Sequence, residues 1–245
     1  MKVLFSGYTL FFLIFSSLSW AQTALDGGWK LVSVDDQPLV GTETIAIYQD
    51  SYFMFGQYQS DGSFISAGGG GYELDGDELK VVYGFFTEDP SEVQSPTTYP
   101  AQLDGDQLTL KNTFSGTQVW ERLDEEATPL TGVWRFATRV DEDGNEGERR
   151  RAGTRMTVKI LSGDRFQWAA YNYATKEFMG TGGGTYKATE DGKYTENIEF
   201  FSRDNSRTGA SLSFQYSRTG DDWYHKGLNS RGEPMHEIWT KGVSN

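Results

Sequence analysis

The strongest constraint on the fold is an internal repeat, because two similar halves must form two similar units. Leu25-Asp26-Gly27-Gly28-Trp29 aligns with Leu130-Thr131-Gly132-Val133-Trp134 as L-x-G-x-W. The copies end in Val119-Trp120-Glu121-Arg122 and Ile238-Trp239-Thr240-Lys241. Between these ends they share an aromatic residue, a glycine run and a second aromatic residue: Phe64, Gly68 to Gly71 and Tyr72 in one copy, and Phe178, Gly182 to Gly184 and Tyr186 in the other.

These landmarks divide the chain into two domains. We place the first at residues 22–123 and the second at 130–245. Residues 124–129 are acidic, end in proline and lack apolar periodicity, which is typical of a linker. Residues 1–21 precede both copies. Each copy is close to the ~100 residues of a common single domain, so each can bury its own core.

Short runs of aromatic and β-branched residues, separated by Gly, Asp and Asn, predict strands throughout both copies. Turns are marked by Asp-Gly pairs, since glycine readily adopts the positive φ that tight hairpins require; they are Asp61-Gly62, Asp75-Gly76, Asp104-Gly105, Asp143-Gly144 and Asp191-Gly192. The pattern predicts an all-β protein made of two consecutive small antiparallel β-barrels. A β-sandwich with the same number of strands is the alternative.

The N-terminal residues predict export. Lys2 precedes the apolar stretch from Val3 to Leu18, and Ser19 and Ala21 place small residues where a signal peptidase would cleave after Ala21. The apolar stretch is too short and too polar for a membrane span. We therefore expect a signal peptide and a secreted or periplasmic protein with no membrane insertion after cleavage.

Composition excludes several kinds of chemistry. The chain has no cysteine and two histidines. Disulfides, thiolate nucleophiles and cysteine-ligated metal centres are thereby excluded, and a histidine metal cluster is not expected. We predict no metal and no cofactor.

The two copies differ in charge. Residues 22–123 carry four Lys or Arg against sixteen Asp or Glu, whereas residues 130–245 carry seventeen against sixteen. An acidic surface repels nucleic acid, so none is expected as a partner, and the sequence does not identify a protein partner. The second copy also contains a basic cluster, Arg149-Arg150-Arg151 with Arg155. We interpret this cluster as a solvated surface patch in which neighbouring acids balance the arginine charges, rather than as a binding site for a carboxylate or phosphate.

The G-x-W opening of each copy, and a basic residue two positions after a late tryptophan, resemble the lipocalin or calycin superfamily. In that family the G-x-W tryptophan closes one end of an eight-stranded barrel and a basic side chain from the last strand lies across it. The resemblance implies that Trp29 with Arg122, and Trp134 with Lys241, are structural pairs, and that the chain is a tandem lipocalin-like secreted bacterial protein.

Candidate site residues lie in the second copy, because both histidines and most of the clustered rings are there. Period-two geometry puts Trp223 and His225 on one face of a strand, and the aromatic partner favours the interior. Glu199 is a candidate partner of His225. The predicted ligand-binding set is Tyr171, Tyr173, Glu199, Phe201, Phe214, Tyr216, Trp223 and His225.

Three functions remain open. The favoured one is non-catalytic binding of a small apolar or amphipathic molecule, mainly by the second barrel. The second is an isomerase, cyclase or lyase in which His225 acts as general acid or base, with Glu199 orienting it. The third is a carbohydrate- or protein-interaction module that uses outward-facing rings, which a filled barrel interior would favour.

Overall fold

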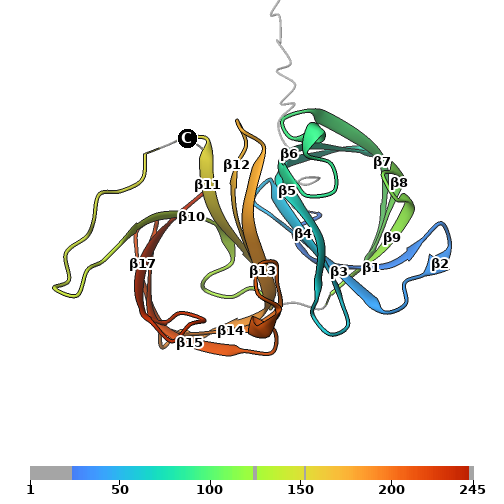
Figure 1. Ribbon diagram of the computed structural model, residues 1–245. Helices are drawn as coiled ribbons and strands as arrows, with labels where there is room; N and C mark the ends of the chain where they lie inside the picture. The colour runs from blue at the N-terminus through green and yellow to red at the C-terminus, as the bar shows by residue number, and fades with distance from the viewer. Residues whose placement is uncertain (1–23, 124–125, 152, 243–245) are drawn as a thin grey trace, which may run out of the picture.

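The computed structural model describes residues 24–123, 126–151 and 153–242. Almost all of the described chain is strand, arranged as two closed eight-stranded antiparallel barrels that lie side by side (Figure 1). The all-β prediction with two tandem barrels is therefore confirmed, and the sandwich alternative is wrong. The predicted signal peptide falls on residues outside the described ranges. Within those ranges, no helix has the length and apolar character needed to cross a bilayer.

The first barrel closes by pairing between its first and last strands, with Trp29 opposite Arg122. A two-residue strand, β2 (Gln37–Pro38), pairs with β1 outside the ring. The eight barrel strands are β1 (Gly27–Val34), β3 (Thr42–Gln49), β4 (Tyr52–Gln59), β5 (Phe64–Asp75), β6 (Glu78–Phe86), β7 (Pro96–Asp104), β8 (Gln107–Thr113) and β9 (Gly116–Arg122).

The second barrel repeats this order and closes with Trp134 opposite Lys241. Its strands are β10 (Gly132–Arg139), β11 (Arg155–Ser162), β12 (Arg165–Asn172), β13 (Glu177–Ala188), β14 (Lys193–Phe201), β15 (Ser211–Thr219), β16 (Asp222–Leu228) and β17 (Pro234–Lys241). A single 3₁₀ turn follows the fifth strand of each barrel, η1 (Pro90–Glu92) and η2 (Asn205–Arg207). The copies can therefore be compared position by position.

The glycine runs mark the place where two backbones approach closely. A Cβ on Gly70 would lie 2.0 Å from the carbonyl oxygen of Val82, and a Cβ on Gly184 would lie 2.1 Å from that of Asn197. Both glycines sit at a β-bulge between the fourth and fifth strands of their barrel. Glycine is required here because the bulge brings the neighbouring strand into the space that a side chain would occupy.

The G-x-W tryptophans close one end of each barrel. The indole of Trp29 donates to the Leu25 carbonyl at 2.9 Å, and Trp134 donates to the Leu130 carbonyl at 2.8 Å. Both side chains are fully buried. These matching bonds fix each indole against the turn that precedes its first strand.

The cation that covers each indole differs between the barrels. The Arg122 guanidinium lies 4.2 Å from the centroid of the Trp29 ring. Over Trp134 the corresponding cation is Arg218, at 5.2 Å, rather than the predicted Lys241. Arg218 is held there because it donates to the carbonyl of Pro129 at 3.1 Å. Lys241 is instead the residue opposite Trp134 in the pairing of β10 with β17.

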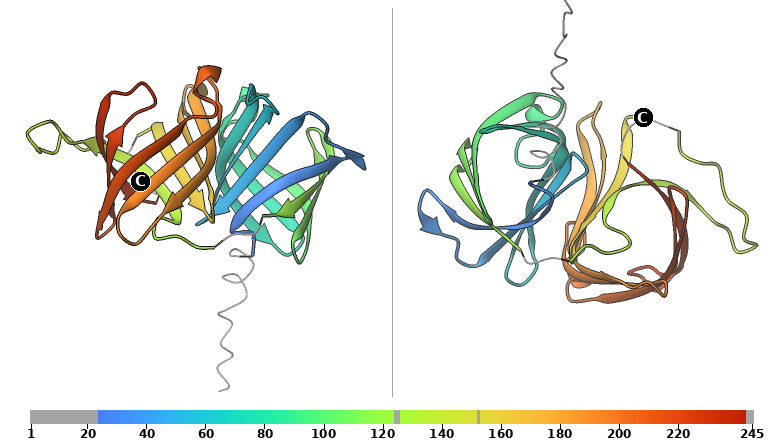
Figure 2. Two further views of the ribbon diagram at one scale, coloured as in Figure 1. Left: turned by 90° about the horizontal axis from the view of Figure 1, so that it is seen from below. Right: turned by 180° about the vertical axis from the view of Figure 1, so that it is seen from behind.

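The barrels share an extensive aromatic interface. β11, β12 and β13 face β3 to β6 in both views of Figure 2, and the connection between β10 and β11 extends on the opposite side of the second barrel. At the centre, the hydroxyls of Tyr52 and Tyr171 lie 2.7 Å apart. The Phe85 ring packs 5.1 Å from that of Tyr171 and 5.8 Å from that of Phe178. Outward-facing rings that a lone barrel would expose are thus buried between the two.

A second contact region centres on Phe200. Its ring stacks on Tyr58 at 4.9 Å, and a Cβ on Gly56 would lie 2.4 Å from it, so only glycine leaves room for the ring. Beside it, the Tyr58 hydroxyl donates to Glu199 at 2.7 Å, and Arg165 donates to both oxygens of Glu199 at 3.0 and 3.1 Å. Burial, with Glu199 adding to it, raises the pKa of Tyr58, so the phenol stays a donor.

We expect Phe200→Ala to lower the free energy of unfolding by about 3 kcal/mol, the usual cost of deleting a buried phenyl ring. The loss should be seen by urea denaturation. Phe114→Ala removes a half-exposed ring and is the matched control, with an expected loss below about 1 kcal/mol. An equal loss in both variants would mean that the barrels do not stabilise each other through Phe200.

Candidate functional site

The first barrel encloses a cavity of about 250 Å³. It lies between the closed end at Trp29 and the opposite end of the barrel, called the mouth below. This volume is slightly below the ~300–1,000 Å³ of sites for drug-sized ligands, so the cavity fits a smaller molecule. Its lining is Leu31, Val34, Leu39, Thr44, Ala46, Tyr48, Phe53, Phe55, Gln57, Ser66, Leu79, Val81, Tyr83, Phe86, Glu88, Tyr99, Leu110, Thr113, Phe114, Ser115, Gln118 and Trp120.

The deep part of this cavity is apolar. Small and aliphatic side chains from Ala46, Leu79, Val81 and Leu110 line it, and all four are buried. Rings surround them, with Tyr48 stacked on Phe53 and Tyr83 stacked on Phe86. Burial raises the pKa of Tyr48 and that of Tyr83, so both phenols are neutral. The hydroxyls of Tyr83 and Tyr99, 3.4 Å apart, are polar groups set among these apolar walls.

Polar side chains gather at the mouth. Gln57 donates to the Thr44 hydroxyl at 3.2 Å and accepts from the Ser66 hydroxyl at 3.3 Å. On the β8–β9 connection, Phe114 is 51% exposed, and its ring lies 5.2 Å from that of Phe86. A ligand with one polar end could place that end at this mouth and its apolar body below.

Register shows why the second barrel is filled at the same depth. In the first barrel Trp29 pairs with Ala46, Tyr72 with Val81 and Ala101 with Leu110; in the second, Trp134 pairs with Lys159, Tyr186 with Glu196 and Tyr216 with His225. Three aliphatic side chains in the first barrel are therefore matched by three polar ones in the second, and Lys159 is much longer than Ala46. We predicted the principal cavity in the second barrel, whereas the cavity just described lies in the first.

Lys159 and Glu196 form a buried ion pair inside the second barrel. The lysine Nζ lies 2.5 Å from a glutamate oxygen, and both side chains are less than 8% exposed. The Tyr194 hydroxyl donates to the same oxygen at 2.7 Å. Four rings, at 5.2 to 5.7 Å, surround the ammonium group, which gains cation–π attraction from them: Phe166, Tyr194, Trp223 and Trp239.

His225 is a buried neutral side chain rather than a carboxylate-assisted base. It is 1% exposed and packs against Phe214, with ring centroids 4.0 Å apart. Neither ring nitrogen has a hydrogen-bond partner among the described residues. Burial, reinforced by the Lys159 charge, holds its pKa well below the ordinary value. This environment gives no support to the predicted acid–base role.

Glu199, the predicted partner of His225, lies at the barrel interface instead. The β13–β14 bulge places Gly184 opposite Ile198 and Gly183 opposite Phe200, so Glu199 is the unpaired residue. The bulge interrupts the period-two alternation on which the pairing rested. The interior carboxylate is that of Glu196.

The remaining predicted ligand-binding residues are divided among three environments. Trp223 and Phe214 are buried in the second barrel, and Phe201 packs on Trp168 at 5.4 Å. Tyr171 is at the barrel interface, and Tyr173 lines a groove of about 540 Å³ between the barrels. Tyr216 donates to the Thr189 carbonyl at 2.9 Å. The structure therefore does not gather this set into one site.

The lining of the first cavity was missed because its residues look like ordinary core. A signal was available in the repeat itself. Aligned on their G-x-W motifs and hairpins, the copies place Ala46, Val81 and Leu110 against Lys159, Glu196 and His225. A small inward-facing residue such as Ala46, aligned with a long one such as Lys159, indicates which copy of a duplicated barrel is hollow.

Comparison with known families places one match over the second barrel. Residues 129–243 match a family model described as a domain of unknown function (DUF4488). The match spans 115 of the 245 residues and assigns no activity. No curated protein matches the chain. Within the described ranges, no three His, Cys, Asp or Glu side chains are grouped so as to hold a metal ion.

We expect Lys159→Met to lower the free energy of unfolding by about 3 to 5 kcal/mol, because it leaves the Glu196 carboxylate buried without its cation. Lys159→Met/Glu196→Leu removes both charges and should recover most of that loss, which urea denaturation would measure. Lys193→Met, at an exposed ion pair, is the control, with an effect near 0.5 kcal/mol. If the double variant were as unstable as Lys159→Met, the loss of stability could not be attributed to the unpaired charge of Glu196.

Proposed function

We propose that this chain is a lipocalin-like binding protein whose first barrel takes up a small apolar or amphipathic molecule. The observation that carries the proposal is the cavity of about 250 Å³ in that barrel. An eight-stranded barrel either fills its interior with side chains or holds one small ligand. Here the second copy is filled with side chains, and the first copy has the cavity that a small ligand could occupy.

The lining indicates the chemistry of the ligand. Aliphatic walls and rings around Ala46 and Val81 favour an apolar body, and the Gln57, Thr44 and Ser66 side chains at the mouth favour one polar group. Glu88 also lines the mouth. The first domain carries an excess of twelve acidic residues, so the polar group should be neutral or cationic rather than anionic.

Export is part of this proposal. Its support is the sequence of residues 2–21 alone, which has the composition of a cleavable signal peptide. A binding protein outside the cytoplasm would meet its ligand without entry into the cell. The resemblance to lipocalins likewise rests on the two G-x-W motifs and on the tandem barrels with which they are compatible.

Cavity-filling variants test the proposal. Ala46→Met/Val81→Met places two flexible apolar side chains in the cavity. Val82→Met is the matched control, because Val82 is the next residue on β6 and is 38% exposed. Binding of n-octanol, indole and 2-naphthol to the full chain would be measured by calorimetry.

We expect saturable binding of at least one probe with a negative heat-capacity change, the mark of apolar burial. Affinity should fall at least tenfold in the double variant, about 1.4 kcal/mol, and stay unchanged in Val82→Met. Flat titrations with all three probes, or equal affinity in the double variant, would refute binding in the first barrel.

A further inference from the structure

The mouth of the second barrel differs in charge from that of the first. Register and matching backbone hydrogen bonds align four mouth positions. Val34, Leu39, Thr42 and Glu88 in the first barrel correspond to Arg139, Arg150, Arg155 and Arg203 in the second. Three of the first-barrel residues line the cavity: Val34, Leu39 and Glu88. Arginine therefore occupies mouth positions that are apolar, neutral polar or acidic in the other copy.

Arg150 is directed into this mouth by local pairing. Its amide donates to the Ala137 carbonyl at 2.8 Å, as the Leu39 amide donates to the Val32 carbonyl in the first barrel. Its guanidinium lies 4.6 Å from the Phe136 ring and donates to the Thr157 hydroxyl at 3.3 Å. Partial burial, followed by the like charges of Arg155 and Arg139, lowers the pKa of Arg150.

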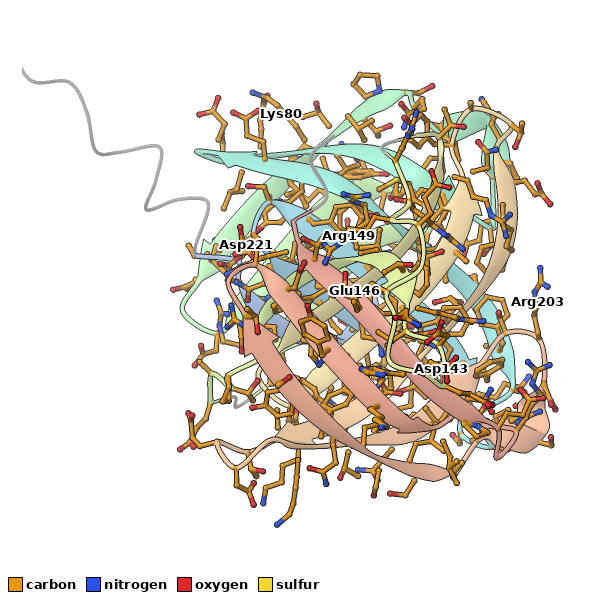
Figure 3. All side chains as sticks on the ribbon, turned by 90° about the vertical axis from the view of Figure 1, so that its left-hand side faces the viewer. Lys80, Asp143, Glu146, Arg149, Arg203 and Asp221 are labelled. Carbon is orange, nitrogen blue, oxygen red and sulfur yellow. The ribbon has the colours of Figure 1, made fainter. Side chains whose placement is uncertain are left out.

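Arg203 approaches the same space from the far side. A Cβ on Gly180 would lie 3.2 Å from its Nε, so its side chain extends over Gly180. Figure 3 shows Arg203 and Asp221 at opposite ends of the second barrel. Thr157, Ala170 and Gly180 are cross-strand neighbours on β11, β12 and β13. Two strand spacings make about 10 Å, so the backbone positions beside which Arg150 and Arg203 lie are about as far apart as the width of a small ring compound.

Few groups neutralise these arginines. Among the described residues, Glu237 is the one carboxylate within salt-bridge distance of any of the four, 3.4 Å from Arg139. That carboxylate is shared, because its other oxygen accepts from Trp239 at 3.2 Å. Arg149 differs from them, since it lies 2.7 Å from Asp222 and beside Glu146 on the outer wall. The mouth thus has positive charge that no carboxylate of the described residues neutralises, whereas the charge of Arg149 on the outer wall is neutralised by Asp222 and Glu146.

Rings form the floor below the arginines. Phe136 lies under Arg150, and Trp168 packs on Phe201 with ring centroids 5.4 Å apart. The indole of Trp168 carries a further N–H donor. Trp168 corresponds by register to Phe55, which lines the first cavity. Guanidinium groups above aromatic faces, with an additional N–H donor, are suited to a flat molecule that bears an oxyanion.

We propose that the mouth of the second barrel binds a small ring-bearing organic anion, with Arg150 and Arg203 donating to its carboxylate or phosphate and Phe136 and Trp168 contacting its ring. The site is separate from the first cavity and does not depend on binding there. Taken together, the two proposals give the two copies different ligands: neutral or cationic molecules bind to the first barrel and anions bind to the second.

The test is calorimetry on the full chain at low ionic strength with phenyl phosphate, benzoate, inorganic phosphate and neutral phenol. Arg150→Met and Arg203→Met remove one guanidinium each while keeping an apolar stem. Arg149→Met is the control, because it changes the adjacent residue whose charge is already bound to Asp222 and Glu146. Thermal melting checks that all variants remain folded.

We expect saturable binding of phenyl phosphate or benzoate, and which of the two binds identifies the oxyanion. Each mouth variant should weaken that binding about 10- to 100-fold, as the loss of a charge-assisted hydrogen bond does, and Arg149→Met should leave it unchanged. Any phenol binding should be the same in all variants. The proposal is overturned if neither organic anion binds, if Arg149→Met weakens binding as much as the mouth variants, or if inorganic phosphate binds as tightly as phenyl phosphate.

Discussion

The interior of an eight-stranded barrel is the space on which the rest of this structure depends. Eight strands enclose a volume that inward-facing side chains can just fill, so a few substitutions decide whether the barrel is hollow. With Ala46, Val81 and Leu110 at the deep positions, the first barrel keeps a cavity. With Lys159 and Glu196 joined as an ion pair at two of the same positions, the second barrel is filled. The same backbone is thereby hollow in one copy and filled in the other.

Packing between the barrels makes this division possible. Each barrel has outward-facing rings, such as Phe85 and Phe200, that would be exposed if it stood alone. Pairing the barrels buries them, and the Tyr52–Tyr171 and Tyr58–Glu199 hydrogen bonds satisfy the polar groups that are buried along with the rings. The hollow barrel can therefore lose core volume and still be supported from outside. Because these rings are buried between the barrels, fewer rings remain exposed for the third function, a carbohydrate- or protein-interaction module.

Much of the fold followed from the sequence, because hairpin turns, strand alternation and the repeated G-x-W motif are local or periodic signals. The site followed less well. The period-two rule correctly placed Trp223 and His225 on one face of a strand, but the bulge between Ile198 and Phe200 turned Glu199 outward. The cavity was missed because hollow and filled barrels have the same alternation. They differ in the side chains at a few inward-facing positions, such as Ala46 and Lys159, and that difference shows only when the two copies are compared position by position.

Xenon binding tests the central claim most directly, since a dry apolar cavity of even about 150 Å³ takes up xenon. A crystal structure under xenon pressure should show anomalous density between Ala46, Val81 and Leu110 in the first barrel, and none around Lys159 in the second. Xenon in the second barrel with none in the first would contradict the assignment of the hollow and filled copies.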